Sequence, residues 1–278
     1  MQRTLTALCL ATTLALIGCS GSGSGSGERA TETDDRTPAE VLHAAVDATL
    51  EAQAFDIDSA ADLSIGSDDL SLGAEGAVDY ENLVSDVAIS LEQGSKGGEL
   101  EVRADGERLW LRTGGTMVPA VPGGKTWVEG RADLLAETET FNPEGLVGVV
   151  LALLAAEDVE EGDSGERDGV TAREFTTTVS YRDAVEAAGD RAQAFRTSLN
   201  LTGQADTSEL EIVAWVGDDD VIRDFDLDIQ AGSGIPVDGT YAVEISDVGG
   251  EVDPPETPDA AEVLTGPSAD TFLSQMLQ

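Results

Sequence analysis

Apolar and polar residues alternate with a period of two through most of the chain. This period is typical of strands with one buried face. Short turns rich in Asp and Gly separate several of the segments, for example 217–220. The pattern predicts an antiparallel sheet in a sandwich, barrel or half-barrel. The predicted strands cover residues 55–65, 70–80, 87–91, 100–104, 109–111, 170–180, 210–216, 221–229 and 241–245.

Four segments are predicted to be helical. Thr37-Pro38-Ala39-Glu40 has the form of a capping box with proline at the first helical position, and opens a helix that reaches about Ala54. Asn142-Pro143-Glu144 is a second start signal, followed by a helix over 145–156. Residues 146–154 are apolar on every side, so we expect this helix to be buried or to lie against something apolar. Further helices are expected over 181–195 and 268–277.

The N-terminus has the pattern of a secretory signal that ends at a lipid-attachment site. Arg3 precedes an uncharged apolar run that ends in Leu16-Ile17-Gly18-Cys19. The run is too short to span a bilayer, and a small residue directly before the cysteine is typical of a bacterial lipobox. The alternative is an ordinary signal peptide that contains a cysteine by chance. We expect cleavage after residue 18 and a diacylglycerol on Cys19. Because cleavage also removes Cys9, the mature chain has no pair of cysteines for an intrachain disulfide.

Four regions follow from these signals. Residues 1–18 are the signal peptide, and residues 19–36 are a flexible Gly/Ser and acidic tether behind the lipidated cysteine. Residues 37–253 are one folded domain. Residues 254–278 are a proline-rich exit and the C-terminal helix.

The chain is strongly acidic, with 55 Asp and Glu against 15 Lys and Arg, and a formal net charge of −40. Binding to nucleic acid requires basic residues that replace counterions, so this class is excluded. On the predicted strands the acids take the positions opposite to the apolar residues, as in Asp224, Asp226 and Asp228. A solvated outer face explains this string better than a calcium loop does. With only two lysines, Lys96 and Lys125, the surface is typical of a salt-adapted, halophilic protein.

No motif in the sequence points to catalysis, a metal or a cofactor. The single histidine, His43, falls inside the first predicted helix, which makes a Ser-His-Asp triad improbable. Gly162-Asp163-Ser164-Gly165 resembles a protease nucleophile signature, but lies in an acidic stretch expected to be a loop. Carboxylate pairs are too numerous to single out one. We therefore predict a protein that is not an enzyme.

The order of several short motifs resembles the mycobacterial LppX/LprAFG lipoprotein family and, more remotely, the carriers LolA and LolB. After the lipobox and first helix come an Asp-Gly hairpin at 104–111 and a tryptophan strand at 125–128. Asn142-Pro143, Asp168-Gly169-Val170, a hairpin over 214–223, a strand over 241–248 and a proline exit at 253–255 follow in the same order. The high acidity is the main departure from this family.

The resemblance implies an α+β fold, a curved antiparallel half-barrel whose concave face is closed by helices. It also implies an apolar cavity in which the protein binds or carries a lipid or acylated glycolipid, as in lipid transport, and anchoring at the extracytoplasmic face of the cell membrane. The alternative function is a tethered interaction or sensor module that binds another envelope protein, and a packed core is the alternative to a cavity. The expected cavity residues are Leu100, Val102, Leu109, Leu111, Leu146, Val149, Val150, Leu153, Phe225, Leu227, Ile229 and Val243.

Overall fold

The computed structural model describes residues 35–65, 68–138, 141–199, 208–230 and 237–276. The chain divides into two units, Met1–Asp35 and Arg36–Gln278, and the folded part described below is the second. The predicted signal peptide, Cys19 and most of the tether lie outside the described residues.

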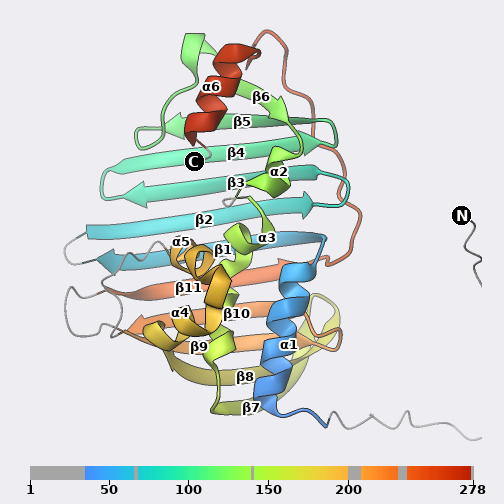
Figure 1. Cartoon of the computed structure of the whole chain (residues 1–278), viewed down its shortest axis with the longest axis vertical. Coiled ribbons are helices and arrows are strands. Elements are labelled where there is room, and N and C mark those ends of the chain that lie inside the picture. Colours follow the sequence, from blue (N-terminus) through green and yellow to red (C-terminus); the bar gives the residue numbers. More distant parts are fainter. Residues whose placement is uncertain (1–34, 66–67, 139–140, 200–207, 231–236, 277–278) are drawn as a thin grey trace, which may run out of the picture. The chain divides into compact units, whose positions relative to one another are not determined.

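Twelve strands form one open sheet in the order β12-β6-β5-β4-β3-β2-β1-β11-β10-β9-β8-β7 (Figure 1). All pairs are antiparallel except β12 with β6. Together with the helices this gives an α+β fold, as expected. The strands are β1 (Ala54–Ile65), β2 (Asp68–Asp79), β3 (Val84–Gln93), β4 (Lys96–Asp105), β5 (Arg108–Gly115), β6 (Trp127–Arg131), β7 (Val159–Arg167), β8 (Val170–Ser180), β9 (Glu209–Gly217), β10 (Ile222–Gln230), β11 (Val237–Ser246) and β12 (Val263–Leu264).

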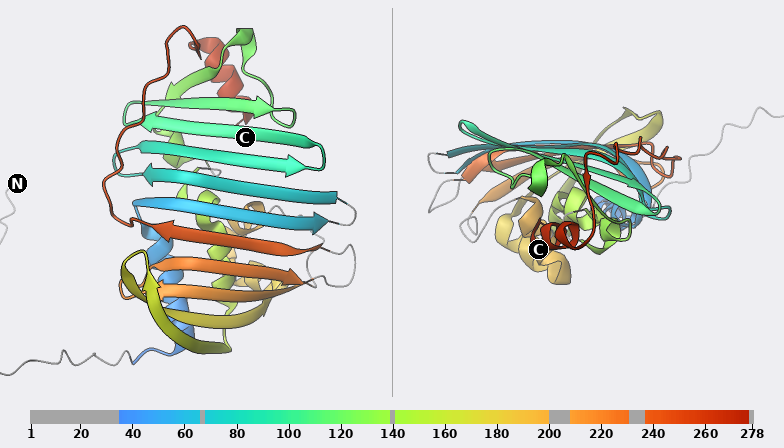
Figure 2. Two further views of the ribbon diagram at one scale, coloured as in Figure 1. Left: turned by 180° about the vertical axis from the view of Figure 1, so that it is seen from behind. Right: turned by 90° about the horizontal axis from the view of Figure 1, so that it is seen from above.

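Strand register divides the sheet into an inner face, which carries the apolar core, and an acidic outer face. One cross-strand row of the inner face runs Ile57, Gly76, Val87, Val102 and Leu111. The helices lie on this side only (Figure 2). On β10, Phe225, Leu227 and Ile229 are buried, while Asp226 and Asp228 are exposed on the outer face. The predicted segregation of acids from apolar residues is therefore confirmed on this strand.

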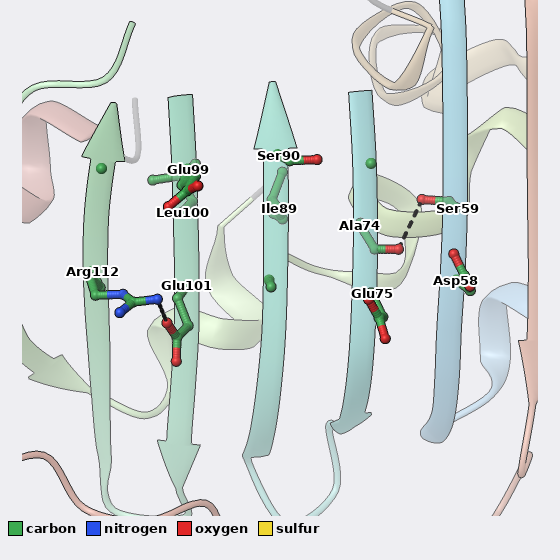
Figure 3. A pocket seen from close by; sticks show the side chains of 13 residues that line it. Asp58, Ser59, Ala74, Glu75, Ile89, Ser90, Glu99, Leu100, Glu101 and Arg112 are labelled. Atoms are coloured by element: carbon green, nitrogen blue, oxygen red, sulfur yellow. Dashed lines mark hydrogen bonds and ion pairs between the residues drawn. The ribbon is translucent and has the colours of Figure 1, made fainter. Parts of the chain in front are cut away.

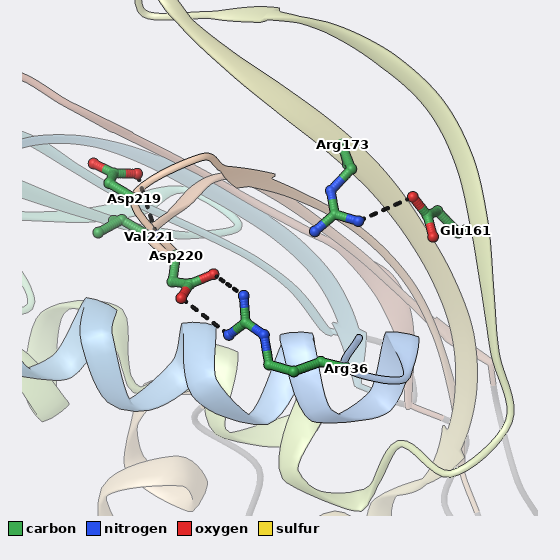
Figure 4. Close-up of polar contacts among 6 residues, drawn as sticks. All are labelled: Arg36, Glu161, Arg173, Asp219, Asp220 and Val221. Carbon is green, nitrogen blue, oxygen red and sulfur yellow. Dashed lines mark hydrogen bonds and ion pairs between the residues drawn. The ribbon is translucent and has the colours of Figure 1, made fainter. Parts of the chain in front are cut away.

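Helix α1 (Pro38–Glu51) begins at the predicted capping box. The Thr37 hydroxyl accepts from the Glu40 amide at 3.3 Å, and Glu40 accepts from the Thr37 amide at 2.8 Å. Its apolar side is buried, and the Thr49 hydroxyl accepts a hydrogen bond of 3.0 Å from the Ile222 amide. Just before the helix, Arg36 pairs with Asp220 in the turn between β9 and β10 (Figure 4). Both ends of α1 are therefore bonded to one hairpin.

The apolar segment 146–154 forms a helix, but mostly of the tighter 3-10 type. Asn142 caps α3 (Pro143–Val147), its side chain accepting from the Gly145 amide at 2.8 Å. The eight-residue 3-10 helix η2 (Gly148–Ala155) follows. Gly148 and the β-branched Val149 and Val150 favour the α-helix weakly, which accounts for the change at this point. Residues 148–153 are all buried, and η2 packs against β8, α1, α4 and α5.

The helix predicted over 181–195 is broken in the structure. Ser180 caps α4 (Tyr181–Ala188), which ends at Gly189 with a φ of 57°. The turn η3 (Gly189–Arg191) then leads into α5 (Ala192–Ser198). Glycine enters the left-handed region without a steric cost, so it is a natural helix end. The remaining short helices are α2 (Leu134–Glu137) and the turn η1 (Pro122–Gly124).

The acidic stretch predicted to be a loop at 157–168 is instead the edge strand β7. It pairs with β8 and shifts register between Glu161 and Ser164. Most of its residues are exposed, so neither face carries the apolar alternation that reveals a strand. Exposed acids on an edge strand also discourage pairing with other chains.

The proline-rich exit forms a strap along the sheet, which we define as residues 247–266. Arg103 donates to the Glu256 carbonyl at 3.3 Å and Lys125 to the Ala261 carbonyl at 2.6 Å. The strap ends in β12, beside β6, and leads into α6 (Pro267–Met276), which packs on β6.

Trp110 points to the outer face as its position predicts, but it is only 1% exposed because it packs with Trp127 and Val263.

Within the described part of the chain, no helix has the length and apolar character needed to cross a membrane.

Candidate functional site

The structure places the predicted cavity residues on one side of the sheet. All eight that belong to strands lie on the inner face, and the other four belong to α3 and η2. Leu100 is half-buried and the remaining eleven are buried in one continuous cluster. Whether any of them borders a bound ligand stays a prediction.

The helices cover the inner face unevenly. On the inner side of β8, the buried helix η2 packs against this strand and against α1, α4 and α5, and α1 also contacts β7 and β10. Next to the β3–β4 turn, no labelled helix lies over the ends of β2, β3 and β4 (Figure 1). One part of the inner face is therefore covered by the protein's own apolar segment, and no labelled helix covers the part beside the β3–β4 turn, which we call the open part.

The open part carries only aliphatic side chains at its centre. Leu72 and Leu91 share one cross-strand row with Gly98, and Ala74, Ile89 and Leu100 form the next row. These five side chains are half-buried, and all of them except Ala74 pack against the main core. We call Leu72, Ala74, Ile89, Leu91 and Leu100 the aliphatic patch.

A loop after β5 borders the patch. A Cβ atom added at Gly98 would lie 2.7 Å from Val118 Cγ2, so the glycine leaves the space into which Val118 packs. The Met117 amide bonds to the Gly97 carbonyl at 3.1 Å, and the Thr113 hydroxyl bonds to the Pro119 carbonyl at 2.6 Å. These bonds hold Met117 and Val118, both half-buried, at the side of the patch.

The outer face behind the patch is polar. A hollow of about 470 Å³ there crosses β1 to β5, and its row of side chains includes Asp58, Glu75, Ala88, Glu101 and Arg112 (Figure 3). Four acids and one arginine line it, so this hollow is a poor site for an apolar ligand.

Glu101 organises the basic side chains beside this hollow. It pairs with Arg103 at 2.6 Å and also with Arg112. The two guanidinium groups lie 5.0 and 5.5 Å from the centre of the Trp127 ring. Cation–π contacts of this kind favour the stacked arrangement. The outer face at β4 to β6 is therefore a structural network that also holds the strap through Arg103.

A second hollow, of about 610 Å³, lies between β6, α2 and α6. Gly130, Leu134 and Leu273 provide its apolar surface, while Glu129, Arg131, Glu137 and Asp270 are charged. Leu273 and Leu134 already approach Gly130 closely, so the apolar part is small. This hollow is less suited to long aliphatic chains than the patch is.

Burial perturbs two acids on the outer side of the sheet. The side chain of Asp226 reaches solvent, but the surrounding strands remove part of its hydration, and this desolvation, followed by repulsion from Asp224, raises its pKa above the ordinary range. Burial, with repulsion from Asp247 and Asp168, likewise raises the pKa of Asp56. Both shifts come mainly from loss of hydration and only secondarily from neighbouring acids, so they do not by themselves point to a catalytic pair.

The candidate catalytic motifs do not come together in the described residues. Ser164 belongs to the edge strand β7 and His43 to α1, and both lack the hydrogen bond that a nucleophile and its base would share. No group of three or more His, Cys, Asp or Glu side chains in the described ranges is arranged to hold a metal ion.

The sequence prediction missed four of the five patch residues. Leu72, Ala74, Ile89 and Leu91 were expected on strands, but only Leu100 was expected at a ligand site. Alternation identifies the apolar face of each strand, and it carries no information on which part of that face the helices leave open.

Neither a family model nor a curated protein matches the sequence. Among solved structures, LprF from Mycobacterium bovis is similar over 78% of this chain and 95% of its own, with 11% identity and a TM-score of 0.43. The lipoprotein LppX from Mycobacterium tuberculosis covers 77% of this chain and 96% of its own, with 12% identity and a TM-score of 0.39. A LolA superfamily protein from Nitrosomonas europaea covers 80% and 96%, with 9% identity and a TM-score of 0.20. LprF and LppX belong to the family that the sequence motifs resemble.

Proposed function

We propose that this protein is a membrane-anchored envelope lipoprotein that binds a lipid or acylated glycolipid on the aliphatic patch. In this proposal the sheet acts as the wall of a half-barrel, and acyl chains lie along Leu72, Leu91 and Leu100. The observation that carries the proposal is the open, uncharged part of the inner face, in a chain whose other surfaces are strongly acidic.

Two features of the chain support this function. The lipobox pattern at Cys19 and the tether behind it would hold the domain at a membrane, where acylated ligands are found. Burying half-exposed aliphatic side chains against acyl chains is favourable by about 25 cal/mol per Å² of apolar area removed from water. The aliphatic patch is half-exposed in the described chain, so a bound acyl chain would gain this burial energy.

The alternative, a tethered module that binds another envelope protein, would use the same patch. An apolar surface can be covered by a protein partner as well as by a lipid. The two functions differ in what purifies with the soluble domain, residues 37–278, produced without the lipobox.

Native mass spectrometry of this domain, followed by organic extraction, tests the proposal. We expect a lipid adduct and displacement of a bound apolar fluorophore by added lipid. Leu91→Asp should abolish both because it places a charge within the patch. Ser90→Asp is the matched control, since it adds the same charge on the outer face of the same strand. An empty wild-type domain that binds no fluorophore, or a Leu91→Asp variant that is folded and binds normally, would overturn the proposal.

A further inference from the structure

Charge is distributed very unequally between the two sides of β2 to β5. On the inner side, register and alternation leave two charged residues, Asp68 and Lys96, within the described strands. The outer side of the same strands carries many charged residues, both acidic and basic. These residues are Asp69, Glu75, Asp79, Asp86, Glu92, Glu99, Glu101, Arg103, Asp105, Arg108 and Arg112.

Lys96 lies at the rim of the aliphatic patch. Leu63, Leu70, Gln93 and Lys96 form one cross-strand row of the inner face, directly beside the row of Leu72 and Leu91. Gly94 and Ser95 make a tight turn between β3 and β4, which sets Gln93 opposite Lys96. The row therefore ends in an amide and an ammonium group, both exposed, at the border of an aliphatic surface.

This lysine is not used by the fold. No carboxylate of the described residues forms an ion pair with Lys96. By contrast, the chain's other lysine, Lys125, bonds to the Ala261 carbonyl in the strap. In a chain with 55 acids, a cation without an acidic partner is available for a ligand.

We propose that the ligand of the patch is an anionic amphiphile, with its acidic group at Lys96 and Gln93 and its acyl chains on Leu91, Leu72 and Leu100. This inference rests on the proposed lipid-binding function and adds the charge class of the headgroup. A lysine can lay its methylene stem on apolar surface while its ammonium group meets a phosphate or carboxylate in water. The Gln93 amide is a second donor to the same oxygen atoms.

The nearby acids leave this arrangement intact. Asp68 lies on the inner side of the same rim, two strands from Lys96, which is roughly 10 Å at ordinary strand spacing. That separation is about one Debye length at physiological salt, so its repulsion is weak. Glu92 and Glu99 point to the outer face.

Competition between two lysolipids with the same acyl chain tests the headgroup. Lysophosphatidylglycerol and lysophosphatidylcholine, both below their critical micelle concentrations, displace an apolar fluorophore from the soluble domain. Monomeric lipid is used because the net charge of the protein would repel an anionic vesicle. We expect the anionic lipid to bind roughly two- to fivefold more tightly, as one exposed ion pair allows, and the preference to shrink in high salt.

Lys96→Gln should remove the preference and leave the affinity for lysophosphatidylcholine unchanged. Lys125→Gln is the matched control, because it removes the same charge away from the patch. Equal binding of both lipids to the wild type, or a preference that survives in Lys96→Gln, would refute the anionic headgroup while lipid binding stands. If neither lipid displaces the fluorophore, the proposed function fails together with this inference.

Discussion

Arg36 and Asp220, 184 residues apart, face each other with two parallel hydrogen bonds of 3.0 and 2.8 Å. The pair joins the start of α1 to the β9–β10 turn, where Asp220 has a φ of 60° (Figure 4). Thr49 makes a second bond to the same hairpin from the last turn of α1. The first helix of the domain is thus fixed to strands that come much later in the sequence.

A double-mutant cycle measures this pair. Arg36→Ala with Asp220→Asn should give a coupling of about 0.5 kcal/mol, at the weak end because both side chains are 37% exposed. Asparagine is chosen because it tolerates the positive φ. Urea unfolding of the four proteins gives the coupling energy, which should decline between 0.05 and 1 M NaCl. A coupling that is independent of salt would show that the pair is not mainly electrostatic.

Salt should stabilise the whole domain. The outer face holds many acids with few basic partners, and screening reduces their mutual repulsion. We expect the melting temperature to rise by several degrees between dilute buffer and molar KCl, where about 1 kcal/mol corresponds to roughly 2–4 °C. Chloride is preferred to sulfate, which strengthens apolar burial by itself. A melting temperature that falls with KCl would contradict the salt-adapted surface.

Asp226 should make stability depend on pH, because loss of hydration and then repulsion from Asp224 disfavour its charged form in the folded protein. Its pKa in the folded state is raised, so the folded protein holds this proton at pH values where the unfolded chain has released it. Stability is therefore lost as pH rises from the unfolded pKa through the folded pKa.

Asp226→Asn removes that loss. The variant should be more stable than the wild type at pH 7, and the difference should vanish below the unfolded pKa of aspartate. Asp228→Asn, on the same face but farther from Asp224, should give a smaller gain. Urea unfolding at several pH values measures both, and an Asp226→Asn variant that is less stable at pH 7 would show that the carboxylate has a stabilising partner.

Leu151 should be among the most sensitive positions for core stability. It is fully buried in the middle of η2, so Leu151→Ala should cost about 2–5 kcal/mol through lost burial and a residual cavity. Leu154→Ala, three residues along the same helix and half-buried, should cost clearly less. Chemical denaturation compares the two. If both substitutions lowered the free energy of unfolding by the same small amount, the side chains around η2 would not be tightly packed.

Cys19 should decide membrane association. Cys19→Ala in the full-length protein removes the thiol that would carry the diacylglycerol, so the protein should move from the membrane to the soluble extracytoplasmic fraction. Cys9→Ala, inside the predicted signal peptide, should leave the distribution unchanged. Fractionation with detection of the folded domain gives the result, and persistent membrane association of Cys19→Ala would overturn the lipobox assignment.

The sequence predicts best the elements whose pattern is set by local burial. Strands β8 to β10 were expected within one residue or two of their bounds, because each buries one face. β7 was missed because neither of its faces is buried. The outward direction of Trp110 follows from alternation, whereas its burial depends on a strap that arrives about 150 residues later.

The candidate site was predictable only in part. Lys96 has the same strand parity as Leu100, so its inner position could have been inferred from the sequence. Its place at the edge of an uncovered region could not, because that depends on where α2, α5 and α6 dock. Similarly, the apolar character of 146–154 predicts burial, and the low helix propensity of Gly148, Val149 and Val150 weakens the α-helix. Propensity does not specify the 3-10 form that this segment takes where it packs among α1, α4 and α5.

The strand order also has a consequence for how the chain reaches its fold. β1 to β6 lie side by side in chain order, and so do β7 to β11, although α4 and α5 stand between β8 and β9 in the sequence. Each of these two blocks is therefore built from strands that follow one another along the chain. Within the sheet the two blocks meet along the seam of β1 with β11, whose partners, such as Ile57 and Ile245, are far apart in the chain. Closing such a long loop is slow compared with forming hairpins. β1 therefore waits for β11, the last strand of the second block, before it has a neighbour on both sides, and α1 waits for β10 and η2, against which it packs.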